Sequence, residues 1–299
     1  MHAVTDGAGV SGGPEVSGSG RRVRGGWLWG VSGLVTAMLI AAPAALLFGR
    51  AGLPEGVFGI ATGTPAATHL TFTVPQPVRA LTVDSYGAMV RIRAGAVSRV
   101  TVSETIPAKA SGGTPQATHS VSGGRLTVTN SACANNACAA DFTITVPADV
   151  TADVSSQGGP VMVSGTAGAT IESGGGAVGA SRIGGPLAVS TDGGPLTVTG
   201  LAGTLNADTG GGIAIAQDVS AASADISTEG GPAMVGFAAP PRSLIVRTGG
   251  GTAQITVPGG PYALAADSGG GPEAVEVATD PSAPRSLTVT TQGGQLFIG

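Results

Sequence analysis

The stretch Val154-Ser-Ser-Gln-Gly-Gly-Pro-Val-Met-Val163 decides the fold, because close copies of it return along the second half of the chain. The copies are Val189-Ser-Thr-Asp-Gly-Gly-Pro-Leu-Thr-Val198, Ile226-Ser-Thr-Glu-Gly-Gly-Pro-Ala-Met-Val235 and Val289-Thr-Thr-Gln-Gly-Gly-Gln-Leu-Phe-Ile298. Each copy reads as a strand, a polar corner, a glycine pair free to take positive φ, and a second strand with aliphatic residues at i and i+2. Such repetition is the signature of stacked units.

Glycine pairs mark these units throughout residues 148–299, at intervals of about 17 to 23 residues. The pairs begin at Gly158, Gly175, Gly193, Gly211, Gly230, Gly250, Gly270 and Gly293. One unit buries too few aliphatic side chains to offset the entropy lost on ordering it, so units must stack, about 4.8 Å apart, and share a core. The sequence therefore predicts an all-β protein, a β-solenoid of about eight coils.

Residues 68–147 precede the repeats and show the alternating pattern of half-buried strands. Apolar residues alternate in pairs such as Leu81 and Val83, or Val90 and Ile92, with turn residues between the runs. We expect these strands to cap one end of the solenoid. The other end finishes at Leu296-Phe297-Ile298-Gly299 without a helix or charged cap, which predicts an open C-terminal edge able to self-associate.

An uncharged apolar run, residues 27–48, lies near the N-terminus and is long enough as a helix to cross a hydrocarbon core of about 30 Å. Three arginines precede it and Arg50 alone follows, so a cytoplasmic tail (1–26), a single-pass anchor in the cell membrane and an extracellular C-terminal domain are expected. Residues 49–67 read as a linker. The alternative is a signal peptide cleaved after about Ala44. No cysteine lies near this segment to carry a lipid.

Two cysteines, Cys133 and Cys138, lie beyond the anchor in a polar segment. In an oxidising compartment thiols this close in sequence are expected to form one disulfide, which would fix a loop. A metal site would need further ligands, and the chain has only three histidines, so no metal is predicted.

Composition argues against several function classes. Charged residues make up 11% of the chain and the formal net charge is −4, so no cationic surface for nucleic acid is expected. Calcium-binding β-rolls require Gly-Gly-x-Gly-x-Asp nonapeptides, whereas here aspartate precedes the glycines. No Gly-x-Ser-x-Gly elbow occurs in residues 51–299, so nucleophilic catalysis has no support there.

Paired carboxylates are the remaining catalytic candidate, because some β-solenoids carry enzymes that cleave polysaccharides. Asp192 and Asp208 lie before neighbouring glycine clusters and could be one coil apart, as a glycosidase pair would require. The same corner holds Gln157, Ser173, Glu229 and Gln292 in other units, which favours a generic polar turn. We therefore predict no enzyme activity, no catalytic residues and no cofactor.

Several motifs together carry a family resemblance over residues 68–299. They are Phe72-Thr-Val-Pro75, Leu81-Thr-Val83, Val90-Arg-Ile92, the two-cysteine segment, Ile144-Thr-Val-Pro147 and the glycine-pair coils, all after an apolar anchor. The pattern resembles the bacterial putative-adhesin domain of unknown function. The resemblance implies a β-solenoid on the cell envelope and a role in adhesion, and it brings no functional residues with it.

The leading hypothesis is thus a noncatalytic, adhesin-like envelope protein that binds a cell-wall, glycan or protein partner. An envelope signalling or stress accessory coupled to a cytoplasmic partner is the alternative, and a carbohydrate-active enzyme is a third.

Overall fold

The computed structural model describes residues 67–106, 117–130 and 140–299, which all belong to the second of two compact units, 60–299. The regular secondary structure of these residues consists of β-strands only. None of them belongs to a helix that could span a membrane. The predicted anchor 27–48, the tail 1–26, nearly all of the linker 49–67, and both Cys133 and Cys138 lie outside the described residues.

The strands make two sheets. Sheet A has 12 strands in the spatial order β1-β4-β7-β3-β9-β11-β13-β15-β17-β19-β23-β21. In that order their bounds are Thr68–Thr73, Thr101–Ile106, Asp141–Pro147, Val90–Gly95, Val161–Ser164, Val178–Ser181, Leu196–Thr199, Ala214–Val219, Ala233–Phe237, Ala253–Thr256, Leu296–Ile298 and Glu273–Val275.

Sheet B has 11 strands in the order β20-β22-β18-β16-β14-β12-β10-β8-β2-β6-β5. Their bounds, in that order, are Ala263–Asp267, Ser286–Thr291, Ser243–Thr248, Ser223–Thr228, Leu205–Thr209, Leu187–Thr191, Gly168–Ser173, Thr151–Gln157, Ala80–Tyr86, Arg125–Asn130 and Ala117–Ser122.

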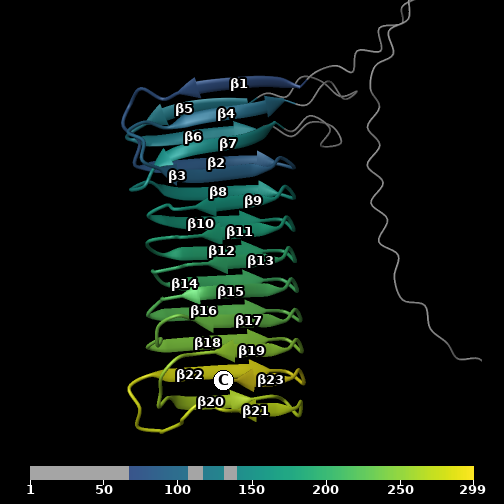
Figure 1. The fold of residues 1–299 in the computed structure, drawn as a ribbon. Helices are drawn as coiled ribbons and strands as arrows, with labels where there is room; N and C mark the ends of the chain where they lie inside the picture. Colours follow the sequence, from purple (N-terminus) through teal and green to yellow (C-terminus); the bar gives the residue numbers. More distant parts are fainter. Residues whose placement is uncertain (1–66, 107–116, 131–139) are drawn as a thin grey trace, which may run out of the picture. The chain divides into compact units, whose positions relative to one another are not determined.

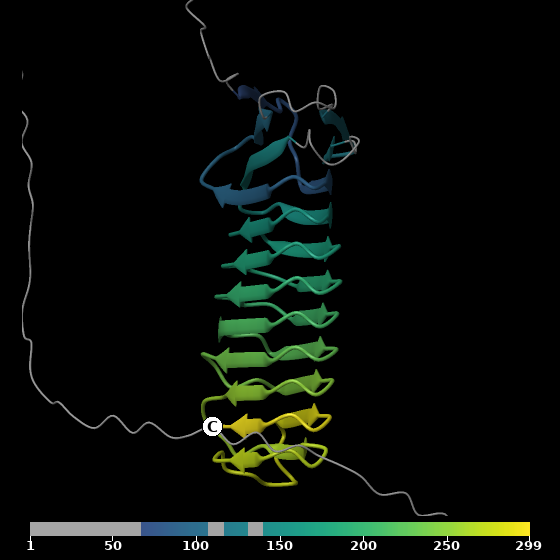
Figure 2. The ribbon, with the colours of Figure 1, turned by 90° about the vertical axis from the view of Figure 1, so that its right-hand side faces the viewer.

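Each glycine-pair unit contributes one strand to each sheet, as Figures 1 and 2 show for successive layers. Strand β10 pairs in parallel with β8 and β12, while β11, from the same unit as β10, pairs in parallel with β9 and β13. The register carries over from layer to layer, as where Ile171 lies between Val154 and Val189, except for a shift between β15 and β17. The predicted all-β class is confirmed, in the form of two sheets dominated by parallel pairs.

The core lies between the two sheets and consists of the inward residues of every strand. Val161 and Val163 of β9 in sheet A are almost fully buried, and so are Leu187 and Val189 of β12 in sheet B. Burial of such a side chain contributes about 2 kcal/mol. Equivalent residues of successive strands form continuous columns, so each layer covers its neighbours' apolar side chains.

A row of buried hydroxyls runs beside this core, two residues before each glycine pair. Each hydroxyl donates a hydrogen bond to the carbonyl oxygen three residues later, as Thr209 Oγ1 does to Gly212 O at 2.8 Å. The row comprises Ser156, Ser173, Thr191, Thr209, Thr228, Thr248, Ser268 and Thr291, and Ser85 makes the same bond to Ala88 O beside the single Gly87. The pattern of the repeats places Ser173 at a polar turn together with Gln157, Glu229 and Gln292. The structure corrects this, because the Ser173 side chain is buried and its hydroxyl donates a hydrogen bond to Gly176 O.

The two glycines of each pair have different structural roles. The first takes a φ between 94° and 150° in all eight units, as predicted. The second packs against the backbone of the neighbouring layer. A methyl group on Gly212 would overlap the carbonyl oxygen of Gly194, and one on Gly194 would overlap that of Gly176. Glycine is therefore required twice, once for conformation and once for close approach.

Residues 68–147 supply the strands at one end of both sheets. Strands β3 and β7 are parallel in sheet A, and β2 and β6 are parallel in sheet B, while β1, β4 and β5 pair antiparallel. Strand β5 was not predicted. Its sequence, Ala117-Thr-His-Ser-Val-Ser122, is too polar to show a clear apolar alternation.

The prediction that the C-terminal strand forms the open edge was wrong. Strand β23 lies between β19 and β21, and β22 lies between β18 and β20, so the last unit of the sequence is inserted one layer inside the end. The inserted unit carries the fully buried Leu287, Val289, Leu296 and Ile298. Strand β21 is exposed along its length, so the more apolar unit occupies the covered layer and the more polar one forms the end.

The end layer is also poorly suited to recruit another strand. Strand β21 is only 3 residues long. Residues 278–280 pair with Tyr262, which accepts a hydrogen bond from the Asp280 amide and donates one to Ala278 O. Short and covered edges oppose the addition of further strands.

Candidate functional site

The carboxylates considered from sequence, Asp192 and Asp208, do not form a matched pair. Asp208 lies beside Ser190 in the register of β14 and β12, whereas Asp192 lies after the end of β12, in the corner. Both side chains are exposed. Among the described residues no group of three or more His, Cys, Asp or Glu side chains could hold a metal ion.

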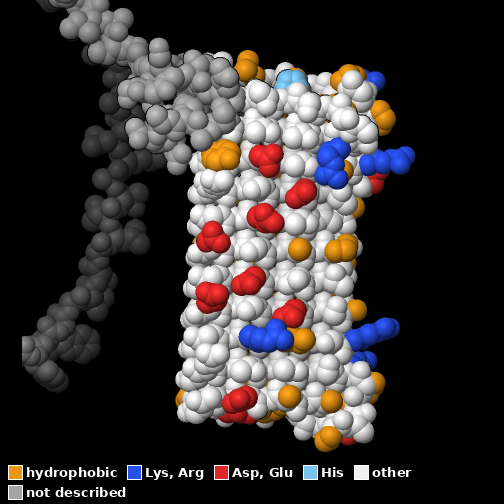
Figure 3. Space-filling model, turned by 180° about the vertical axis from the view of Figure 1, so that it is seen from behind, with side chains coloured by type: hydrophobic (Ala, Val, Ile, Leu, Met, Phe, Trp, Pro, Cys, Tyr) orange, Lys and Arg blue, Asp and Glu red, His pale blue; other side chains and the backbone are white. Residues whose placement is uncertain are grey.

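The outer face of sheet B is acidic, as the view in Figure 3 shows. Asp153, Glu172 and Asp208 point outward from β8, β10 and β14. A hollow of about 440 Å³ on this face is lined by Glu172 and Asp192 together with serines and Gln157. Within the described part of the chain there is one ion pair, Arg247 to Asp225 at 2.9 Å, and it lies on this sheet.

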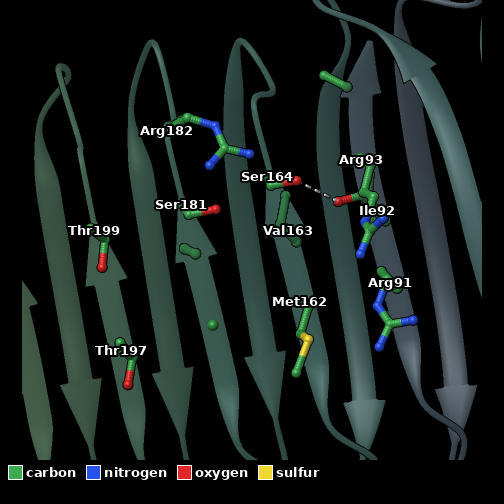
Figure 4. Close-up of a pocket in the computed structure, with 13 residues that line it drawn as sticks. Arg91, Ile92, Arg93, Met162, Val163, Ser164, Ser181, Arg182, Thr197 and Thr199 are labelled. Carbon is green, nitrogen blue, oxygen red and sulfur yellow. Dashed lines mark hydrogen bonds between the residues drawn. The ribbon is translucent and has the colours of Figure 1, made fainter.

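The outer face of sheet A carries a local cluster of arginines. A groove of about 440 Å³ crosses β3, β9, β11 and β13, and its lining includes Arg91, Arg93 and Arg182 but no acidic residue (Figure 4). The two β3 arginines are two residues apart, so alternation along the strand directs both to the outer face. We call this the arginine groove.

Arg182 has an unusual backbone, which among the described non-glycine residues only Asp218 shares, with φ 54°. It follows β11 with φ 52°, a left-handed conformation that costs a non-glycine residue about 1–2 kcal/mol. The neighbouring layers have glycines at this corner, Gly165 and Gly200, also at positive φ. A hydrogen bond from the Arg182 amide to Thr199 O holds the conformation. Strain of this kind is concentrated at binding sites.

Outward hydroxyl groups and the space left by one glycine complete the lining of the arginine groove. Ser164, Ser181 and Thr199 occupy equivalent positions on β9, β11 and β13 and lie in one row with Arg93. Gly179 lies between Met162 and Thr197 in the next row, where the missing side chain leaves space. Figure 4 shows the Arg182 guanidinium extending over the strands toward Ser164.

This arrangement is suited to binding rather than to catalysis. Guanidinium groups donate paired hydrogen bonds to carboxylate or phosphate oxygens, and serine and threonine hydroxyls can bond to sugar or polyol hydroxyls. Neither a histidine nor a carboxylate, the usual general bases, lines the arginine groove.

Sequence reasoning missed this site. The motif Val90-Arg-Ile92 predicts a strand with an outward arginine, but it does not show which strands lie beside it. The stronger signal is at residue 182, where alignment of the repeats places an arginine among glycines 165 and 200. A large charged residue at a position that needs positive φ points to a role for its side chain.

Comparison with known proteins gives structural likenesses only. No family model matches the chain, and no curated protein matches it. A crystal structure named as a putative adhesin from Parabacteroides distasonis ATCC 8503 is similar at 14% identity and a TM-score of 0.45, over 79% of this chain and 98% of that one. A putative adhesin from Parabacteroides merdae ATCC 43184 gives 15% identity and a TM-score of 0.34, over 78% and 96%.

A third structure, named as a putative cell adhesion protein from Clostridium sporogenes ATCC 15579, has 12% identity and a TM-score of 0.28, over 78% of this chain and 99% of that one. The function is therefore argued from the geometry of this chain.

Proposed function

We propose that the protein is a noncatalytic, adhesin-like binding module of the bacterial cell envelope. In this proposal the two sheets are the walls of a β-solenoid, with residues 148–299 as its coils and 68–147 as its cap. Parallel pairing between successive units and the matching corners at Gly158 through Gly293 support this architecture.

The same proposal keeps the expected attachment to the cell membrane. Residues 27–48 are the anchor, 1–26 the cytoplasmic tail and 49–67 a linker that holds the solenoid outside the cell. A disulfide between Cys133 and Cys138 would form in that compartment. Presentation of a rigid structure beyond the membrane suits a protein that contacts a surface.

One observation carries the proposed activity: the outer face of sheet A has an open groove lined by arginines and hydroxyls and free of acidic groups. A flat, regular face offers many weak contacts to an extended partner, and affinity then depends on several contacts made together. We assign partner binding to this face and not to sheet B.

Two bulky substitutions on opposite faces test the assignment. Gly179→Trp fills the arginine groove from β11, and Ala188→Trp adds the same side chain to the outer face of sheet B from β12. The full-length chain, purified in mild detergent, is titrated against isolated bacterial envelope fragments. We expect Gly179→Trp to weaken binding by about tenfold or more and Ala188→Trp to leave it unchanged. Equal binding by both variants would contradict the assignment, provided circular dichroism shows both folded.

A further inference from the structure

We propose that the arginine groove takes a linear anionic polymer, with repeated carboxylate or phosphodiester groups along a hydroxyl-rich backbone. Acidic polysaccharides and polyol phosphates share this chemistry. The inference rests on the proposed function and names the class of ligand that the sheet A face recognises.

The positions of two arginines define the direction in which such a polymer would lie. Arg93 is on β3 and Arg182 follows β11, with β9 between them, so the two positions are two strand spacings apart, roughly 10 Å. Ser164 and Ser181 lie in the cross-strand row that begins at Arg93. A chain lying along the stack of layers would meet a cation, then hydroxyls, then a second cation.

The exposure of the groove favours a polymer over a small anion. Arg93 and Arg182 are both exposed, and a single ion pair in contact with water contributes little. Connected anionic groups engage both arginines at once, because after the first contact the second group is already held nearby. Binding should therefore depend strongly on the length of the ligand.

The lining of the groove also disfavours nucleic acid, another linear polyanion. Binding of single strands relies on aromatic side chains on which bases stack, and none of the lining residues is aromatic. Hydroxyls and the Met162 side chain instead suit a polyol or sugar chain. A second copy of this protein, docking through its acidic sheet B face, is the other competing occupant.

Two variants of Arg182 separate binding from stability. Arg182→Gly removes the guanidinium and restores the residue type that neighbouring layers use at this positive φ, so it should fold at least as stably as the wild type. Combined with Arg93→Gln it removes both ends of the proposed contact. Arg247→Gln, on the outer face of sheet B, is the matched control.

The experiment measures binding of the full-length chain in detergent to polygalacturonate, poly(glycerol phosphate), neutral dextran, galacturonic acid monomer and single-stranded DNA. We expect at least one of the two anionic polymers to bind, and the polymer that binds more tightly identifies the preferred anionic group. Neutral dextran and the galacturonic acid monomer should not bind. Arg93→Gln with Arg182→Gly should lower affinity about tenfold or more, whereas Arg247→Gln should not.

Three results would overturn the inference: equal binding of DNA, equal binding of the monomer, or an unchanged affinity in the double variant. A double variant that loses self-association in sedimentation, with no polymer bound by the wild type, would assign the groove to a second copy. The proposed function fails separately, when Gly179→Trp leaves binding to envelope fragments intact.

Discussion

At the scale of single residues, the buried hydroxyls explain how sharp corners are tolerated inside a dry core. A corner leaves a backbone carbonyl facing the interior, and a buried carbonyl without a donor is costly. The row of serines and threonines supplies that donor within the same corner. The hydroxyl in each copy of the repeat is therefore structural, although serine and threonine commonly face solvent.

Thr209→Val tests this role, because it keeps the shape of the side chain and removes the donor to Gly212 O. We expect the free energy of unfolding to fall by about 1–3 kcal/mol. Thr197→Val, on the outer face of β13, should change it by less than about 0.5 kcal/mol. Chemical denaturation followed by circular dichroism gives both values, and equal effects would show that the hydroxyl row does not stabilise the corners.

Glu104 provides a pH-dependent effect near the N-terminal end of the sheets. The residue is 6% exposed, and burial raises the pKa of its carboxyl above the usual 4.5, while His119 partly lowers it. Because the pKa is higher in the folded state, the contribution of Glu104 to the free energy of unfolding is complete below the usual pKa. This contribution is lost as the pH rises through the folded-state pKa. The ionised side chain is thus destabilising at neutral pH.

Glu104→Gln should therefore gain stability relative to the wild type as pH rises from about 4 to about 8. Thermal unfolding in a series of buffers measures the difference, and His119→Gln controls for the effect of the neighbouring imidazole on Glu104. A constant difference between Glu104→Gln and the wild type across this range would contradict the expected effect.

At the scale of strands, the order of the last two layers differs from their order in the sequence. The chain forms β20 and β21 at the end and then returns to place β22 and β23 one layer further in. Amides of β23 are bonded within the sheet on both sides, whereas β21 has one strand neighbour. Protection from solvent should follow this spatial order.

Hydrogen exchange measures that protection directly. We expect peptides from residues 286–299 to exchange more slowly than peptides from residues 263–275, although the former include the chain terminus. Faster exchange at the terminus would mean that β22 and β23 form the outer layer, as the sequence alone suggested.

Sequence patterns predicted the strands and corners of the repeats well, because each unit contains the local residues that determine them. Alternating aliphatic residues gave the strands, and the first glycine of each pair gave the positive φ. The layer exchange could not be found this way, since both final units carry the same glycine-pair signal and differ only in how apolar their strands are. The arginine groove needed the register between β3 and β11, which lie far apart in sequence.

At the scale of the whole domain, charged side chains are distributed unevenly over the two outer faces. Outward acidic residues such as Asp153, Glu172 and Asp208 lie on sheet B, whereas three arginines cluster at the groove of sheet A. The formal net charge of −4 over the whole chain therefore does not exclude a local cationic surface. The arginine groove gives the domain one region that attracts anionic material.

Removal of residues 286–299 tests the integrity of the domain. The shortened chain would leave β18 and β19 without their outer neighbours and would expose inward residues such as Leu244 and Ile255. Unpaired, apolar strands of this kind promote association. We expect aggregation in light scattering, where the full-length chain stays dispersed; a dispersed truncated chain with unchanged thermal stability would contradict this.

The inserted last unit also determines when the structure can be finished. Each layer from β10 to β19 pairs with a layer that precedes it in the sequence, so these layers can stack one after another as the polypeptide is made. Strands β20 and β21 cannot, because the strands beside them are β22 and β23, which emerge afterwards. The last layers of the domain can therefore pair only after residues 286–299 have been synthesised. A chain that stops before them keeps unpaired strands that quality-control proteases can recognise.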